Sequence, residues 1–102
     1  MTSFVFEDID ASRHALRGEL TFSTAYAAYS DGVRRLMALG KGAHCEFDCS
    51  GLTESDSAGL SVLIEWKGKA ARRGIALVYR GLPESLGRLA RISDVEALLR
   101  AA

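Results

Sequence analysis

The sequence predicts an α/β fold with one mixed sheet of four to five strands and helices packed against it. Strand-length segments of apolar or alternating residues are interleaved with longer segments of helical period, in the order β-β-α-β-α-β-α with a final short helix. The chain has 102 residues, 48% of them hydrophobic and 25% charged, which is typical of one compact domain. We therefore expect residues 1–102 to form a single domain whose β-α-β-α-β portion is largely parallel, with right-handed crossovers.

The first half of the chain predicts two strands followed by a helix. The strands are expected near residues 4–7 and over "HALRGEL" (14–20). The segment 22–40 then carries apolar residues spaced four, three, four and three apart, which predicts one apolar stripe of an amphipathic helix: Phe22, Tyr26, Tyr29, Val33 and Leu36. Tyr26 and Tyr29 could either pack in the core through this stripe or be exposed at an interface. Gly32 weakens this prediction, because glycine costs about 1 kcal/mol in a helix interior.

The middle of the chain predicts a second strand–helix–strand unit. "AHCEFDC" (43–49) alternates apolar and polar residues, which favours a strand. A helix is expected from Ser57 onward, with four apolar residues on one side: Leu60, Leu63, Ile64 and Ala71. Trp66 could belong to the core or to its rim. "IALVYRG" (75–81) has the pattern of a buried strand.

The last twenty residues predict two further helices. Pro83 suits the first turn of a helix that buries Leu86, Leu89 and Ala90. Ser93 and Glu96 have the spacing of a capping box, which would begin the final short helix.

Composition and charge exclude several functional classes. Lys plus Arg and Asp plus Glu both total 13, so the net charge is zero, which argues against non-specific nucleic-acid binding. The basic residues within 67–73 are interpreted as a solvated helix face. No signal peptide is visible, and no apolar run approaches the ~20 residues that span a bilayer, so we expect a cytoplasmic protein without direct membrane insertion.

Cys45 and Cys49 are expected to be buried free thiols. In a strand their Cα atoms would lie about 13 Å apart, whereas a disulfide needs less than ~7 Å. Two sulfurs alone also make a poor metal site, so neither a metal nor another cofactor is expected.

The stretch "LTESDSAGL" (52–60) places Ser57 at a strand-to-helix turn. A hydrolase nucleophile elbow needs glycine two residues before and after the serine; Gly59 fits, but position 55 is serine. The histidines that could act as the base are His14, which the sequence does not place, and His44, expected at the opposite sheet edge. No catalytic residue is therefore predicted. The Gly-Lys-Ser/Thr ending of a phosphate-binding loop is also absent.

Two interpretations of Ser57 stay open. Ser57 could be presented to a partner: the unmodified hydroxyl beside small Ala58 and Gly59 gives a surface that another backbone can approach closely, and a phosphoryl group would be favoured by the helix dipole, typically by about 0.3–1 kcal/mol, although Glu54 and Asp56 would oppose it. Alternatively Ser55, Asp56 or Ser57 simply caps the helix.

Three stretches together resemble the STAS domain family. They are "GELTFSTAY" (18–26), "FDCSGLTESDSAGLSVLIEWKGKAARRG" (47–74) and "LPESLGRLARISDVEALL" (82–99), and the similarity spans about residues 14–99. The short Asp-Ser-Ala-Gly motif at 56–59 gains specificity from the "DCSGL" strand before it and the Leu-rich helix after it. Within the family, "GELTF" and "LARISDVEALL" look most like the MlaB type.

The resemblance implies a non-catalytic role. MlaB-type proteins are small cytoplasmic subunits of a bacterial phospholipid-transport ABC complex, which also holds permease and MCE-type subunits, and they bind its ATPase. The family's contact hydroxyl maps onto Ser57, within the motif Asp56, Ser57, Ala58 and Gly59. A contact aromatic maps onto Tyr29, with Tyr26 the neighbouring candidate. The related antagonists of anti-sigma factors, of the SpoIIAA type, use the same serine as a phosphorylation switch for a kinase partner, which is the alternative function.

Overall fold

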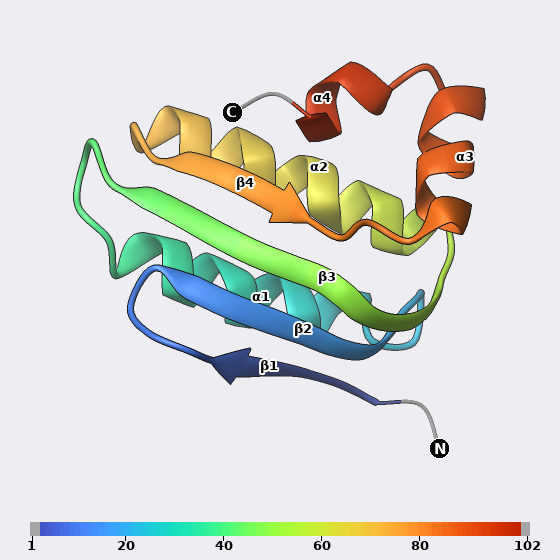
Figure 1. Ribbon diagram of the computed structural model, residues 1–102, viewed down its shortest axis with the longest axis horizontal. Coiled ribbons are helices and arrows are strands. Elements are labelled where there is room, and N and C mark those ends of the chain that lie inside the picture. Colours follow the sequence, from blue (N-terminus) through green and yellow to red (C-terminus); the bar gives the residue numbers. More distant parts are fainter. Residues whose placement is uncertain (1–2, 101–102) are drawn as a thin grey trace.

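A computed structural model describes residues 3–100; residues 1–2 and 101–102 of the expected domain lie outside this range. Figure 1 shows eight elements in the predicted order: β1 (Phe4–Asp8), β2 (Arg13–Leu20), α1 (Ala25–Met37), β3 (His44–Ser55), α2 (Ser57–Arg72), β4 (Ala76–Arg80), α3 (Glu84–Ile92) and α4 (Glu96–Arg100). The predicted α/β class and the element order are confirmed. The described chain forms one sheet of four strands, the lower number of the predicted range.

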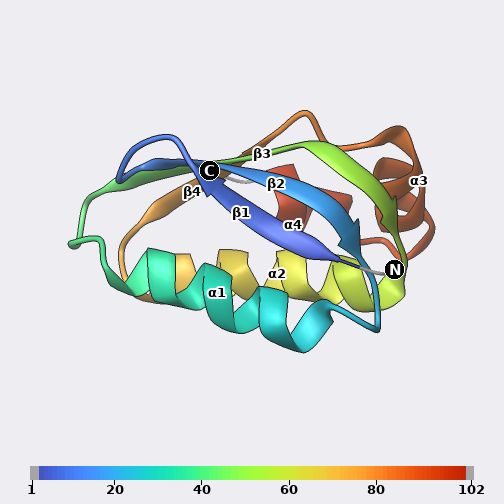
Figure 2. The ribbon, with the colours of Figure 1, turned by 90° about the horizontal axis from the view of Figure 1, so that it is seen from below.

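The sheet has the strand order β1-β2-β3-β4. β1 and β2 form an antiparallel hairpin, whereas β2, β3 and β4 run parallel, as predicted. Figure 2 shows α1 and α2 side by side on one face of the sheet. Because β2 and β3 are parallel, their carboxyl ends meet at one end of the sheet, and α1 and α2 both begin there.

Trp66 is fully buried and forms the centre of the core. Its ring meets that of Phe47, on β3, edge-on at 5.3 Å, and its indole N–H donates to the carbonyl oxygen of Tyr29 at 3.1 Å. Of the two placements left open for Trp66, the structure therefore selects the core. Cys45 and Cys49 lie on the same inner face of β3 as buried free thiols, as predicted, and burial raises their pKa values to about 11 and about 12.

The buried face of α1 agrees with the predicted stripe only in part: Leu36 is buried, and Tyr29 and Val33 are half-buried against the core. The buried residues are Ala28, Gly32 and Leu36, whereas Phe22 precedes the helix and is 84% exposed, and Tyr26 is 85% exposed. A Cβ atom on Gly32 would lie 2.3 Å from the ring of Trp66, so glycine is required where α1 crosses α2. The close approach of Gly32 to Trp66 therefore helps to determine which face of α1 packs inward.

The predicted inner side of α2 is only partly correct. Leu60 and Leu63 are buried as expected, but Ile64 is half-buried and Ala71 is exposed. The buried face turns instead through Val62, Trp66 and Ala70, because the large indole ring fixes the orientation of the helix above β3.

The predicted capping box near the C-terminus is wrong. Ser93 ends α3, with its N–H donating to the carbonyl of Leu89 at 3.0 Å, and Asp94 follows in the left-handed region at φ 59°. The Glu96 carboxylate is held by Arg91 and Arg100, at 3.4 Å each. The chain thus turns sharply between α3 and α4.

Candidate protein-binding site

Ser57 is the first residue of α2 and is exposed. Strand β3 continues to Ser55, six residues beyond the predicted alternating segment, and so carries the chain to the carboxyl end of the sheet. Its extension is held by β2, where the Thr53 hydroxyl donates to the carbonyl of Gly18 at 3.2 Å. The Ser57 hydroxyl takes part in none of the hydrogen bonds found within residues 3–100.

Asp56 is the residue that caps α2. One carboxylate oxygen accepts the N–H of Gly59 and the other accepts the N–H of Phe22, both at 3.1 Å. Asp56 therefore ties the loop before α1 to the start of α2. Partial burial alone would raise the pKa of Asp56, but backbone N–H groups, including those of Phe22 and Gly59, together lower it, so the carboxylate is ionised at neutral pH.

Gly59 brings α2 against the end of β2. A Cβ atom at this position would lie 2.1 Å from the backbone carbonyl oxygen of Leu20, which is closer than van der Waals contact allows. Ala58, one residue earlier, is half-buried. The two small residues thus give this turn a low profile, with the Ser57 side chain above it.

A groove of about 590 Å³ lies beside Ser57, between α1 and α2. Its lining is mainly apolar and includes both tyrosines predicted as contacts: Phe22, Ala25, Tyr26, Tyr29, Ala58, Ser61, Val62 and Glu65. Tyr26 stands at its edge almost fully exposed, whereas Tyr29 is half-buried and packs against the core. The structure thus brings Tyr26, Tyr29 and Ala58 into one lining, directly next to Ser57.

Phe22 was missed as a surface residue by the sequence analysis, which placed it in the core stripe. Two signals could have identified it. It follows β2 by only two residues, and Thr24, directly ahead of α1, is a polar residue of the kind that begins helices. The Thr24 hydroxyl bonds the carbonyl of Glu19 at 2.7 Å, which tightens this loop and leaves the Phe22 side chain outside the helix.

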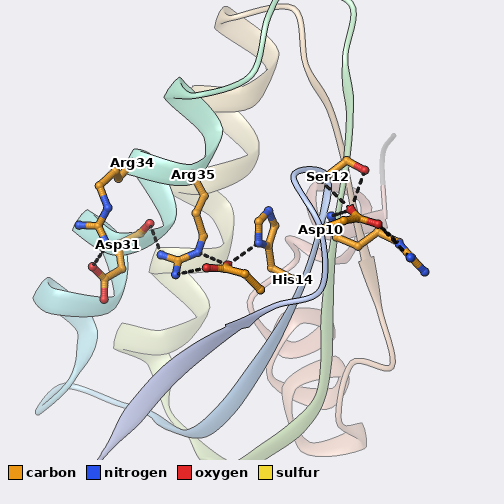
Figure 3. Close-up of polar contacts among 8 residues, drawn as sticks. Asp10, Ser12, His14, Asp31, Arg34 and Arg35 are labelled. Atoms are coloured by element: carbon orange, nitrogen blue, oxygen red, sulfur yellow. Dashed lines mark hydrogen bonds and ion pairs between the residues drawn. The ribbon is translucent and has the colours of Figure 1, made fainter.

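The two histidines lie far along the strands from Ser57. His44 begins β3, at the opposite end from Ser57, as expected. His14 is 4% exposed on β2, and its Nδ1 lies 2.7 Å from the carboxylate of Asp8. Figure 3 shows His14 facing Arg35 of α1, which binds the same Asp8 carboxylate at 2.7 Å. This cluster joins the β1–β2 hairpin to α1 and supplies no base to Ser57.

Comparison with known proteins identifies the family and the fold. A sequence model of the family described as "Mlab, STAS domain" matches residues 7–100. No curated protein is significantly similar in sequence. Among solved structures, the fold is similar to that of the anti-sigma factor antagonist SpoIIAA in its unphosphorylated form, with a TM-score of 0.72 over 98% of this chain and 88% of the other. At 12% identity this likeness concerns the fold alone. The family match covers nearly the whole described chain, and the protein therefore belongs to the MlaB-type STAS domain family.

Proposed function

We propose that this chain is a non-catalytic subunit that binds the ATPase of an ABC-type phospholipid transporter and supports its assembly and activity. The observation that carries the proposal is the match to the MlaB-type family over residues 7–100. The complex would also hold permease and MCE-type subunits and would maintain the lipid asymmetry of an outer membrane.

The surface around Ser57 supports a protein-binding role. Phe22 and Tyr26 are more than four-fifths exposed beside an apolar groove, and exposed apolar patches of this kind mark interaction sites. Aromatic side chains that become desolvated at the centre of an interface carry a large share of the binding energy. Ser57, Ala58 and Gly59 present little bulk, so a partner backbone can approach the start of α2 closely.

Regulation of the ATPase would need no bond to form or break on this chain. If the groove binds one conformation of the ATPase better than another, binding shifts the population toward that conformation.

Within residues 3–100, no group of three or more His, Cys, Asp or Glu side chains is arranged to hold a metal ion.

The proposed location follows from the proposed partner. No helix within residues 3–100 is long and apolar enough to cross a membrane. We propose that the chain is cytoplasmic and reaches the cytoplasmic face of the inner membrane through the ATPase.

Co-expression with the cognate ABC-transporter ATPase tests the proposal. The tagged chain should retain the ATPase in stoichiometric amount through affinity and size-exclusion steps, without any phosphate. Ser57→Arg should lose the ATPase while its circular dichroism spectrum and elution volume stay those of the folded chain. Retention of the ATPase by the variant at the wild-type level would contradict the proposed contact.

The alternative is an anti-sigma-factor antagonist switched by phosphorylation of Ser57. It is favoured by the exposed hydroxyl at the N-terminus of α2, where the helix dipole stabilises a phosphoryl group. Incubation with an anti-sigma kinase and ATP would then add about 80 Da at Ser57 and change the affinity for the kinase. A transporter subunit is expected to remain unmodified in this assay.

A further inference from the structure

The groove between α1 and α2 is formed by acidic segments of the chain. The segments that form it, residues 18–33 and 51–66, contain no lysine or arginine but five acidic residues: Glu19, Asp31, Glu54, Asp56 and Glu65. All 13 lysines and arginines lie elsewhere in a chain whose net charge is zero. The two groove segments are therefore acidic, with Glu19, Glu54 and Asp56 close in sequence to the starts of α1 and α2.

Most of these carboxylates lack a cation of their own. Glu19, Glu54 and Glu65 take part in none of the ion pairs found within residues 3–100. On the sheet, by contrast, Glu7 binds Arg17 at 3.0 Å. Of the five, Asp31 is paired, with Arg34 at 2.9 Å, and outside the groove Asp48 and Asp94 also take part in none of these ion pairs.

Glu19 and Glu54 also lie opposite each other. They are register partners on the adjacent strands β2 and β3, directly before the chain turns into α1 and α2. The pair therefore places two carboxylate-bearing residues next to each other at the carboxyl end of the sheet.

The groove itself combines apolar and acidic character. Its lining is apolar through Ala25, Ala58 and Val62, and Glu65 supplies a carboxylate to the same lining. Two carboxylates lie near the Ser57 end, since Glu54 precedes it by three residues and Asp56 by one. An occupant would therefore meet an apolar floor with negative charge at its rim.

We infer that the partner segment that enters this groove is a basic amphipathic one, whose apolar side chains lie between α1 and α2 and whose lysines or arginines face Glu65. The inference rests on the proposed function and specifies the chemistry of the ATPase surface that would bind. Opposite potentials steer the encounter and reject acidic or phosphorylated segments, which the same carboxylates would repel. Association should then weaken as salt screens the rim charges.

Titration of the chain with the purified ATPase by biolayer interferometry, from about 50 to about 500 mM NaCl, tests this inference. Wild-type affinity should fall with salt. Glu65→Lys should weaken binding about tenfold at low salt and flatten the salt dependence, with Glu65→Gln intermediate. Glu7→Lys makes the same charge change on the sheet, away from the groove, and should leave the affinity unchanged. Melting temperatures would confirm that each variant is folded.

Ser57→Arg in the same series separates the two proposals. If Ser57→Arg abolishes binding while neither salt nor Glu65→Lys changes the affinity, the basic-partner inference is overturned and the proposed function stands. If the wild-type chain does not bind the ATPase at all, the proposed function fails, and the chemistry of the groove is decided by a second assay.

That assay uses two synthetic helical peptides with identical leucine positions, flanked by lysine in one and by glutamate in the other. In ¹⁵N correlation spectra, only the lysine peptide should shift the amides of groove residues such as Tyr26 and Ala58, and Glu65→Lys should remove the shifts. An equal response to both peptides, or to neither, would overturn the inference whatever the ATPase does.

Discussion

Asp56 and Ser57 are adjacent, yet their side chains have different surroundings. The Asp56 carboxylate accepts N–H groups from Gly59 and Phe22, so it caps α2 and fixes the loop ahead of α1. The Ser57 side chain is exposed at the first position of the helix. Of the residues that the sequence left open as the cap, only Asp56 has this geometry, and it leaves Ser57 available for a partner.

A pair of alanine variants tests this division. Asp56→Ala should lower the free energy of unfolding by about 1–2 kcal/mol, because it removes the cap and leaves two backbone donors without their acceptor. Ser57→Ala should change it by less than about 0.5 kcal/mol, as is usual for exposed positions. Urea denaturation, followed by the fluorescence of Trp66, the only tryptophan in the sequence, measures the free energy of unfolding of both variants. Equal losses in the two variants would contradict the assignment of the cap.

At the scale of elements, the periodicity of apolar residues predicted the strands correctly. The buried faces of the helices, which depend on close packing, were predicted only in part. The alternation of 43–49 and the run 75–81 correctly indicated β3 and β4. The inner face of α1 was mispredicted in part, because Gly32 must approach the ring of Trp66 and apolar spacing alone does not reveal that contact. Phe22 was assigned to the core for the same reason.

The candidate site was predictable in part. The Asp-Ser-Ala-Gly motif located the start of α2 correctly, since small and capping residues mark a helix N-terminus. The groove was not predictable, because it depends on how α1 lies against α2. That arrangement is set by the contact between Gly32 and Trp66, which the sequence does not reveal. The roles of Ser57, Tyr26 and Tyr29 in binding remain predictions that the experiments above test.

Two glycines of α2 offer a matched test of the packing at this turn. Gly59→Ala should destabilise the fold by about 1–3 kcal/mol, because its Cβ would collide with the backbone carbonyl of Leu20. Gly68→Ala should stabilise it by about 0.5–1 kcal/mol, since the added Cβ meets only the flexible end of Arg72 at 3.4 Å. Thermal denaturation compares them, and a neutral Gly59→Ala would show that α2 can move away from β2.

For the whole molecule, acid should weaken the link between the hairpin and α1. Hydrogen bonds from Arg35 and then His14 lower the pKa of Asp8 to about 2, below its value of about 3.8 in an unfolded chain. The folded state therefore binds this proton less readily, so the stabilisation is complete above about pH 4 and is lost as the pH falls toward 2. Solvent exposure of Asp8 screens the interaction and limits the size of the effect.

Urea midpoints measured between about pH 7 and about pH 2.5 should fall below about pH 4 for the wild-type chain. Asp8→Asn should lower the midpoint at pH 7 and show a shallower decline in acid, because its side chain does not ionise. Parallel curves for the two proteins would indicate that other carboxylates determine the acid sensitivity.

The whole fold serves to hold the starts of α1 and α2 together at one end of the sheet, with Ser57 exposed beside the groove. The most direct test of the resulting docking surface is isothermal titration calorimetry of the transporter ATPase with the wild-type chain, Ser57→Arg and Ser93→Arg. Ser93 is an exposed serine at a helix end outside the groove, so it controls for the bulk and charge of arginine. We predict that Ser57→Arg weakens binding by about 100-fold or more, because a bulky charged side chain would stand in the close contact at the start of α2, while Ser93→Arg binds like the wild type. Wild-type affinity of Ser57→Arg would contradict the central claim.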